Sequence, residues 1–321
     1  MTAAASDSKI AFLFPGQGSQ KVGMGAELRE SDPEVLNGYL KRADEGSGLP
    51  VSQYVAEGPA EDLTRTDVAQ PALFSLSMAV VDVAREIGLR PDFVAGHSLG
   101  EYTAAAVSGT LDPDDGLPLV CERGRRMAEI QSERPGAMAA IIGLQREKVE
   151  ELCEEASEAG VVAPANVNSP SQIVASGEES GVERLLELAE EADAKRALRL
   201  QVGAAFHSEL MKPVQKGLAE TMDGLSWDEP DTPLVANWSG QILASGQAIH
   251  EALVTQIASP VLWVDCVRTL REAGCGTFLE LGPGRVLSGL VRQIDPEAEV
   301  MNADSREALA SFAESHPQFV G

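Results

Sequence analysis

Short apolar runs alternate with amphipathic stretches along the chain, in the order expected when strands are followed by helices. The apolar residues 9–14 (KIAFLF) end in the Gly-rich FPGQGSQ, and residues 90–98 (RPDFVAGHS) lead into the helical pattern of residues 99–109. Residues 66–88 and 111–130 each carry an apolar face with helical spacing. This alternation predicts an α/β fold with a buried parallel sheet.

A separate period begins near residue 136. From GAMAAIIGL to KRALRLQV the pattern is strand, helix, strand, strand, helix, strand, which is the βαββαβ order of a ferredoxin-like unit. Strand and helix signals alternate again after it, so we expect an inserted subdomain at 133–202 within a core made of 1–132 and 203–321. Residues 44–50 (DEGSGLP) are predicted to form a surface loop.

Charge narrows the classes of partner. The 321 residues include 50 acidic and 25 basic side chains, a formal net charge of −25, and only 7 of the basic residues are Lys. Such a surface repels nucleic acid and anionic membranes, so neither is expected as a partner. Dispersed acid with little Lys is typical of a halophilic protein, because concentrated salt screens the self-repulsion, whereas an ordinary acidic enzyme is the alternative.

Cysteine spacing and the N-terminal segment indicate the compartment. The 4 cysteines form no C-x-x-C pair and have no His at zinc-ligand spacing, so we expect reduced thiols and no metal. The segment MTAAASDSKIAFLF lacks a basic n-region followed by an apolar h-region, and no apolar run is expected to reach membrane-spanning length. The sequence therefore predicts a cytoplasmic protein that needs no cofactor.

The pentapeptide GHSLG places Ser98 at the spacing G-x-S-x-G, between a predicted strand and a predicted helix. In a nucleophile elbow the serine stands at the top of the sheet, and the N–H that follows it points at a developing oxyanion. A chance match is the alternative, since the motif is short, but the strand–turn–helix context favours a nucleophile that attacks acyl groups. The motif does not say whether water or another group accepts the acyl group.

A serine nucleophile needs a general base, and His207 in GAAFHSELM is the best candidate. It follows the serine in the chain, as in α/β-hydrolase-like enzymes, whereas the side chain of His97 should point away from that of Ser98. A histidine at the start of a helix is the alternative for His207. Asp265 and Glu280 could complete a triad by order, or a carbonyl could orient the imidazole instead. The other histidines are expected at the surface and in a polar tail, respectively: His250 and His316.

Two further features bear on acyl chemistry. The backbone N–H groups of Gln17, in FPGQGSQ, and of Leu99 could form an oxyanion hole, although FPGQGSQ could also be a tight turn with no ligand. Arg123 lies on the apolar side of its helix, and a buried guanidinium needs an anion. The residues alone favour an internal carboxylate as that anion, and the alternative is a substrate carboxylate held bidentately.

Six motifs, taken together, resemble the malonyl-CoA:acyl-carrier-protein transacylase family and the related acyltransferase domains of polyketide and animal fatty acid synthases. They are FPGQGSQ, GHSLGEY, RGRRM, NVNSPSQIVASG, AFHSELM and LELGPGRVLSGL, and they occur in the family's order. The match runs from about residue 10 to 295. The resemblance implies an α/β-hydrolase-like core with an inserted ferredoxin-like subdomain. It also implies ping-pong transfer of malonyl from malonyl-CoA to the phosphopantetheine thiol of acyl carrier protein, for fatty acid biosynthesis, by a monomeric enzyme.

The resemblance also implies a role for individual residues. Ser98 would carry the malonyl group, His207 would act as base and then acid, and Arg123 would bind the malonyl carboxylate. Gln17 and Leu99 would donate to the oxyanion, and the backbone carbonyl of Gln256 would orient the histidine. The residues that would contact the substrate are Phe206, Met127, Asn168 and Gln172.

Selectivity and docking follow from the same resemblance. A bulky residue before the histidine goes with malonyl rather than methylmalonyl in the related domains, and Phe206 would fill the space of a 2-methyl branch. Carrier proteins are acidic, so docking on this acidic chain would need a local basic cluster, for which the candidates are Lys21, Lys212, Arg285 and Arg292. A serine esterase or thioesterase, and a non-catalytic binding subunit with the same fold, remain as rival interpretations.

Overall fold

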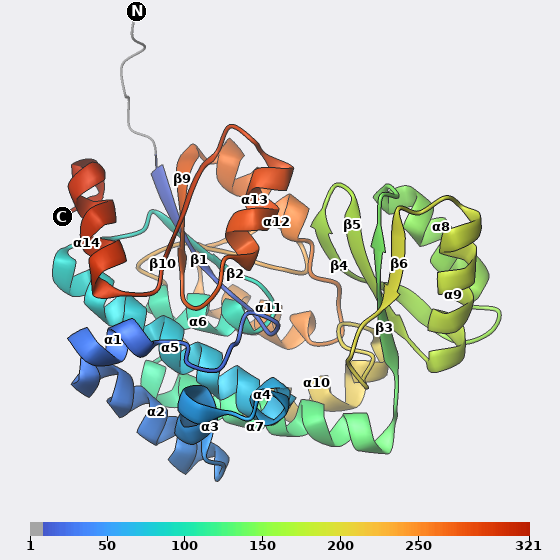
Figure 1. The fold of residues 1–321 in the computed structure, drawn as a ribbon, viewed down its shortest axis with the longest axis horizontal. Helices are drawn as coiled ribbons and strands as arrows, with labels where there is room; N and C mark the ends of the chain where they lie inside the picture. The colour runs from blue at the N-terminus through green and yellow to red at the C-terminus, as the bar shows by residue number, and fades with distance from the viewer. Residues whose placement is uncertain (1–8) are drawn as a thin grey trace, which may run out of the picture.

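Two sheets organise the chain in the computed structural model, which describes residues 9–321 (Figure 1). The segment 1–8, on which part of the signal-peptide expectation rests, lies outside the described residues. The larger sheet has the order β10-β9-β1-β2-β7-β8 and the smaller one β4-β5-β3-β6. The strands of the larger sheet are β1 (Lys9–Phe14), β2 (Phe93–Gly96), β7 (Leu234–Val235), β8 (Ile242–Leu243), β9 (Cys275–Leu281) and β10 (Glu299–Ala303).

The larger sheet is parallel except for its edge strand β8. Side chains of β1 alternate between two faces: Phe12 and Phe14 join one apolar cluster and Leu13 joins the other. In the register between β1 and β2, Phe14 pairs with Gly96. The carboxyl ends of these two strands therefore lie side by side, and they bring FPGQGSQ next to GHSLG.

Helices cover both faces of this sheet, as Figure 1 shows. On one side α12 and α13 pack over β9, and on the other α5 packs against α2, α6 and α7. Their bounds, with the 3₁₀ turns, are α1 (Ala26–Ser31), α2 (Pro33–Ser47), α3 (Val51–Glu57), α4 (Ala60–Thr64), α5 (Thr66–Ile87), α6 (Leu99–Val107), α7 (Pro113–Glu133), η1 (Glu209–Met211), α10 (Lys212–Met222), α11 (Gly246–Gln256), α12 (Trp263–Glu272), α13 (Val286–Ile294), α14 (Arg306–Ser315) and η2 (Pro317–Phe319).

The smaller sheet belongs to a ferredoxin-like subdomain, as predicted. Its strands β3 (Ala137–Ile142), β4 (Val162–Ser169), β5 (Gln172–Gly177) and β6 (Arg196–Arg199) pair antiparallel, and α8 (Arg146–Ala156) and α9 (Glu179–Glu191) cover one face. Along β3, Ala139 and Ile141 face these helices, whereas Met138 and Ala140 face a cleft against the larger domain. The fold is thus the predicted α/β core with an inserted βαββαβ unit, while the boundaries at 132/133 and 202/203 stay predictions.

Three local expectations were wrong. The predicted loop 44–50 is largely helical, because α2 continues to Ser47 and ends at Gly48. Helix α5 is long and apolar enough to cross a membrane by length and composition, contrary to the expectation, but 89% of its most apolar window is buried inside the protein. His316 does not lie in a polar tail: it is 7% exposed and stacks on Phe312. For α5 and His316, packing against neighbouring elements, which local polarity does not report, decided the environment.

Candidate functional site

Ser98 stands on a strained turn between β2 and α6. Its backbone has φ 53° and ψ −106°, a conformation that a residue with a Cβ rarely adopts. A Cβ on Gly100 would lie 2.0 Å from the carbonyl oxygen of Phe14, and one on Gly96 would lie 1.9 Å from the carbonyl of Gly100. Only glycine fits at both positions, so the two glycines of the motif allow β1, β2 and α6 to meet behind the serine.

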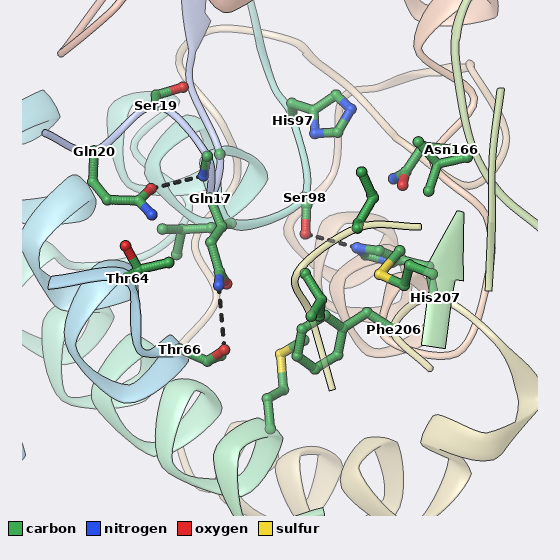
Figure 2. A pocket seen from close by; sticks show the side chains of 18 of the residues that line it. Gln17, Ser19, Gln20, Thr64, Thr66, His97, Ser98, Asn166, Phe206 and His207 are labelled. Atoms are coloured by element: carbon green, nitrogen blue, oxygen red, sulfur yellow. Dashed lines mark hydrogen bonds between the residues drawn. The ribbon is translucent and has the colours of Figure 1, made fainter. Parts of the chain in front are cut away.

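The imidazole of His207 faces the serine hydroxyl across the cleft (Figure 2). The distance from Ser98 Oγ to His207 Nε2 is 2.7 Å, and His207 Nδ1 lies 3.0 Å from the backbone oxygen of Gln256. The carbonyl accepts a hydrogen bond, so Nδ1 carries the proton and Nε2 presents its lone pair to the hydroxyl. The backbone carbonyl, and not a carboxylate, is the third member of the set.

The two carboxylates that were possible by chain order lie elsewhere. Glu280 accepts hydrogen bonds from the N-terminus of α13, including the N–H of Ser288 at 2.8 Å, and Asp265 pairs with Arg146. His97 turns away from the serine, as predicted, and its Nε2 lies 2.8 Å from Asn168 Oδ1. The expectation of a carbonyl orienter is the one that the geometry matches.

Burial and a neighbouring cation keep His207 neutral. Burial is the larger cause and the positive charge of Arg123 the second, and together they lower the pKa of His207 to about 3. A neutral imidazole is the form that can accept a proton from the serine hydroxyl. The imidazole is therefore in the proton-accepting form at neutral pH.

Arg123 reaches the serine from α7, with 1% of its surface exposed. Its Nη1 donates to Gln70 Oε1 at 2.6 Å, and its Nη2 lies 3.2 Å from Ser98 Oγ and 3.1 Å from Gln256 Oε1. Its Nε has no hydrogen-bond partner within the described part of the chain. No carboxylate oxygen of residues 9–321 lies within 4.0 Å of this guanidinium, so the internal ion pair that the residues alone favoured is wrong.

The loop after β1 forms the opposite wall of the cleft. Gln17 lines the cleft together with Ser98, and its side-chain Nε2 donates to Thr66 Oγ1 at 3.2 Å (Figure 2). Gln17 and Leu99, the first residue of α6, both line the cleft. Within residues 9–321 neither of their backbone N–H groups donates to another backbone group, so both can receive an anionic oxygen.

The cleft has a volume of about 970 Å³ and lies between the two domains. Nine of the ten predicted site residues line it, and the tenth, Gln256, lies behind them in contact with His207 and Arg123. The nine are Gln17, Ser98, Leu99, Arg123, Met127, Asn168, Gln172, Phe206 and His207. A volume of this size accommodates an acyl group together with a long thiol arm.

Sequence reasoning missed several polar residues at the site. The side chain of Asn166 points into the cleft in Figure 2, and that of Gln70 binds Arg123. Asn237, two residues after the end of β7, supports the elbow: its Oδ1 accepts from Ser98 N at 2.8 Å and its Nδ2 donates to Gly96 O at 2.7 Å. An amide next to an apolar strand was the available signal, since a buried amide needs partners.

Metal chemistry has no support in the described residues. No three of their His, Cys, Asp and Glu side chains lie together as a metal site would require, and the cysteines are buried free thiols.

Comparison with known proteins gives the family. The acyl transferase domain family matches residues 11–318. A malonyl CoA-acyl carrier protein transacylase of Bacillus subtilis is 43% identical over 303 residues, 94% of this chain and 95% of that protein. The crystal structure of such a transacylase from Xanthomonas oryzae matches with a TM-score of 0.91 at 40% identity, covering 96% of this chain and 98% of the other. A malonyl-transacylase in complex with its type II PKS acyl-carrier protein matches with a TM-score of 0.92 at 39% identity, covering 96% and 100%. The chain therefore belongs to the acyl transferase domain family and, within it, to the malonyl CoA-acyl carrier protein transacylases.

Proposed function

We propose that this protein transfers malonyl from malonyl-CoA to the phosphopantetheine thiol of acyl carrier protein, through a malonyl ester on Ser98, and so supplies extender units for fatty acid biosynthesis. The named relatives carry this activity, and one solved relative holds its carrier protein. The observation that carries the proposal is Arg123: a buried cation without a carboxylate partner in residues 9–321, aimed at the serine oxygen. An acyl group that brings its own carboxylate supplies the missing anion.

The first half-reaction follows from the contacts at Ser98. As Ser98 Oγ bonds to the thioester carbonyl carbon, its proton passes to His207 Nε2, and the N–H groups of Gln17 and Leu99 donate to the oxyanion. When the C–S bond breaks, the coenzyme A thiolate takes that proton from the imidazolium. The Gln256 carbonyl holds the ring in place throughout.

The second half-reaction reverses these steps with the carrier thiol. His207 takes the proton of the phosphopantetheine thiol, the thiolate attacks the malonyl ester, and Ser98 Oγ recovers the proton as it leaves. Arg123 holds the malonyl carboxylate in both halves and so fixes the carbonyl against the serine. Phe206 and Met127 border the acyl group, while Asn168 and Gln172 line the way to the thiol arm.

Two exposed cations that adjoin cleft-lining residues in the sequence support docking of an acidic carrier, since Lys21 follows Gln20 and Arg285 precedes Val286. Lys21 and Arg285 are exposed and form no ion pair with any described residue, and exposed Val286 lies beside Arg285. The other two candidates are engaged: Lys212 lies 3.5 Å from Glu209, and Arg292 donates to the carbonyl of Val300 at 2.6 Å. We therefore assign carrier docking to Lys21 and Arg285. Reversing both charges should raise KM for the carrier protein and leave KM for malonyl-CoA unchanged.

Intact-mass spectrometry tests the proposed reaction. Incubation with malonyl-CoA should add one malonyl group to the wild-type chain and none to Ser98→Ala. When carrier protein is then added, the malonyl group should leave the enzyme and appear on the carrier protein. Free malonate in place of malonyl-carrier would identify a thioesterase instead. A chain that never acquires malonyl would identify a binding subunit and refute the proposal.

Cellular setting forms a further part of the proposal. The family resemblance favours a monomer, the free thiols favour a cytoplasmic setting, and salt would screen the net charge of −25. Sedimentation should therefore give one subunit, and the melting temperature should rise between 0.1 M and 2 M KCl. A melting temperature that falls over this range would identify an ordinary acidic enzyme.

A further inference from the structure

Glu101 is a fully buried carboxylate directly behind the nucleophile. It lies in the first turn of α6, three residues after Ser98, and its exposed fraction is 0%. No basic side chain of residues 9–321 forms an ion pair with it. Its Oε1 accepts from the N–H of Asn237 at 3.0 Å, and its Oε2 accepts from Gln256 Nε2 at 2.7 Å. A carboxylate is costly to bury, so its place between these two amides calls for an explanation.

Gln256 is the residue through which Glu101 reaches the reacting groups. The two hydrogens on its Nε2 are both used, one on Glu101 Oε2 and one on the backbone oxygen of Ser98 at 2.7 Å. Because both hydrogens point at acceptors, the amide cannot flip, and its Oε1 must face Arg123 Nη2. The same residue lends its backbone carbonyl to His207. One amide thus connects the elbow, the guanidinium and the imidazole.

Asn237 makes the second connection. The backbone N–H of Asn237 donates to Glu101, while the side chain of Asn237 binds Ser98 N and Gly96 O in the elbow. Glu101 therefore contacts both residues whose side chains bind the backbone of Ser98. A carboxylate can accept from two donors at once, whereas a carboxamide in its place must turn an N–H towards one of them.

We propose that Glu101 is a positioning residue for malonyl transfer: by anchoring Gln256 and Asn237 it orients Arg123 towards the acyl carboxylate and holds the elbow in register. This inference rests on the proposed function. Glu101 touches no reacting atom, so its contribution passes through the two amides.

Charge makes this anchor sensitive to pH. Burial raises the pKa of Glu101 to about 7, while the hydrogen bonds from Gln256 and Asn237 and the positive charge of Arg123 act in the opposite direction. The other titratable groups around it are Tyr102 on α6, Cys266 on α12 and His207. Protonation of Glu101 weakens its acceptor oxygens, so the orientation of Gln256 should be lost as pH falls through about 7.

A double-mutant cycle tests the route through Gln256. Glu101→Gln should lower kcat for malonyl transfer about tenfold or more with a smaller change in KM, because one buried donor loses its acceptor. Gln256→Ala keeps the backbone carbonyl for His207 and removes the side chain. Adding Glu101→Gln to Gln256→Ala should then change kcat less than about twofold, because the oxygen of the new carboxamide can still accept from the N–H of Asn237. If the two effects multiply independently, Glu101 does not act through Gln256.

The dependence of kcat on pH distinguishes a positioning role of Glu101 from a purely structural one. In the wild type, kcat for malonyl transfer should rise through a step near pH 7, and Gln256→Ala should lack that step. This comparison needs no Glu101 variant, so it holds even if Glu101→Gln fails to fold. The same step in both proteins would overturn the proposal.

A second buried glutamate serves as the matched control. Glu280 is also 0% exposed and accepts three hydrogen bonds, two from Ser288 and one from Leu287 N. Glu280→Gln should lower the melting temperature without changing the ratio of malonyl to acetyl transfer, whereas Glu101→Gln should lower that ratio. Equal ratios in both variants would make Glu101 a structural residue. Absence of malonyl-Ser98 in the wild type would instead refute the proposed function.

Discussion

Arg123→Ala separates the recognition of the malonyl carboxylate from the acyl transfer itself. In the wild type, the guanidinium is 1% exposed and lies 3.2 Å from Ser98 Oγ, with Gln70 and Gln256 as its other partners. The substitution removes the fork that would hold the carboxylate and keeps both Ser98 and the carbonyl that orients His207. Acetyl-CoA has no carboxylate, so its transfer tests the chemistry without the clamp.

The magnitude follows from burial. Removing one partner of a buried ion pair costs about 3–5 kcal/mol, because the remaining charge is left in a site without water. At about 1.4 kcal/mol per factor of ten, kcat/KM for malonyl-CoA should fall about 10²- to 10³-fold or more. Transfer of acetyl should change less than about fivefold, since the neutral acyl group loses one weak contact. Arg123→Lys keeps the positive charge but lacks the planar guanidinium, so its kcat/KM for malonyl-CoA should lie between those of the wild type and Arg123→Ala.

The assay follows acylation of the carrier protein at pH 8 with each acyl donor in turn. Loss of the Arg123 cation should raise the pKa of His207. Activity that needs the neutral imidazole is lost as pH falls through that pKa, so the assay is run at pH 8, where the base is neutral in every variant. Melting curves of the variants show whether the fold is intact. If malonyl and acetyl transfer fall by the same factor, Arg123 does not bind the acyl carboxylate.

Three further predictions concern the walls of the site. Phe206→Ala should raise methylmalonyl transfer relative to malonyl by about 5- to 100-fold in a competition assay, because it opens the space of one methyl group, and an unchanged ratio would remove Phe206 from the acyl pocket. Gly100→Ala places a Cβ 2.0 Å from the Phe14 carbonyl oxygen, so it should destabilise the protein by about 3 kcal/mol or more in denaturant unfolding; near-wild-type stability would contradict the tight elbow. The pKa of His207 is depressed on folding to about 3, so the unfolded chain binds a proton there first, and stability is lost as pH falls from about 6.5 towards 3. Between pH 8 and pH 5 the free energy of unfolding should therefore fall by about 2 kcal/mol more in the wild type than in His207→Gln. An equal pH dependence of the unfolding free energy in both proteins would show a solvated histidine.

Most of the catalytic set could be found in the sequence because it is written in local patterns. The elbow needs glycine on both sides of Ser98, and a strand before it and a helix after it, all within about fifteen residues. The inserted subdomain could be predicted for the same reason, since each strand and helix of 137–199 shows the spacing of apolar residues typical of its type. Arg123 stood out because a cation on an apolar helix face breaks that period.

Contacts between residues far apart in the chain could not be predicted from the sequence. Local pattern offered Asp265 or Glu280 as possible acids and an internal carboxylate for Arg123, and the structure contradicted all three. It was also silent on Asn237, which binds a serine 139 residues away, and on the role of Glu101. Such contacts depend on which strands and helices pack together, and no residue type encodes its distant neighbour.

Helix α5 and Glu101 illustrate where that division lies. By itself the sequence determined that residues 66–87 form an apolar helix and that Glu101 follows the nucleophile, since hydrophobic spacing and backbone propensity act over a few residues. Only the tertiary structure decided that the helix is buried by its neighbours and that the carboxylate faces Gln256 and Asn237. The physical reason is that burial and buried hydrogen bonds come from surfaces meeting across the whole chain, and both the solvation of a helix and the charge of a carboxylate change when they meet.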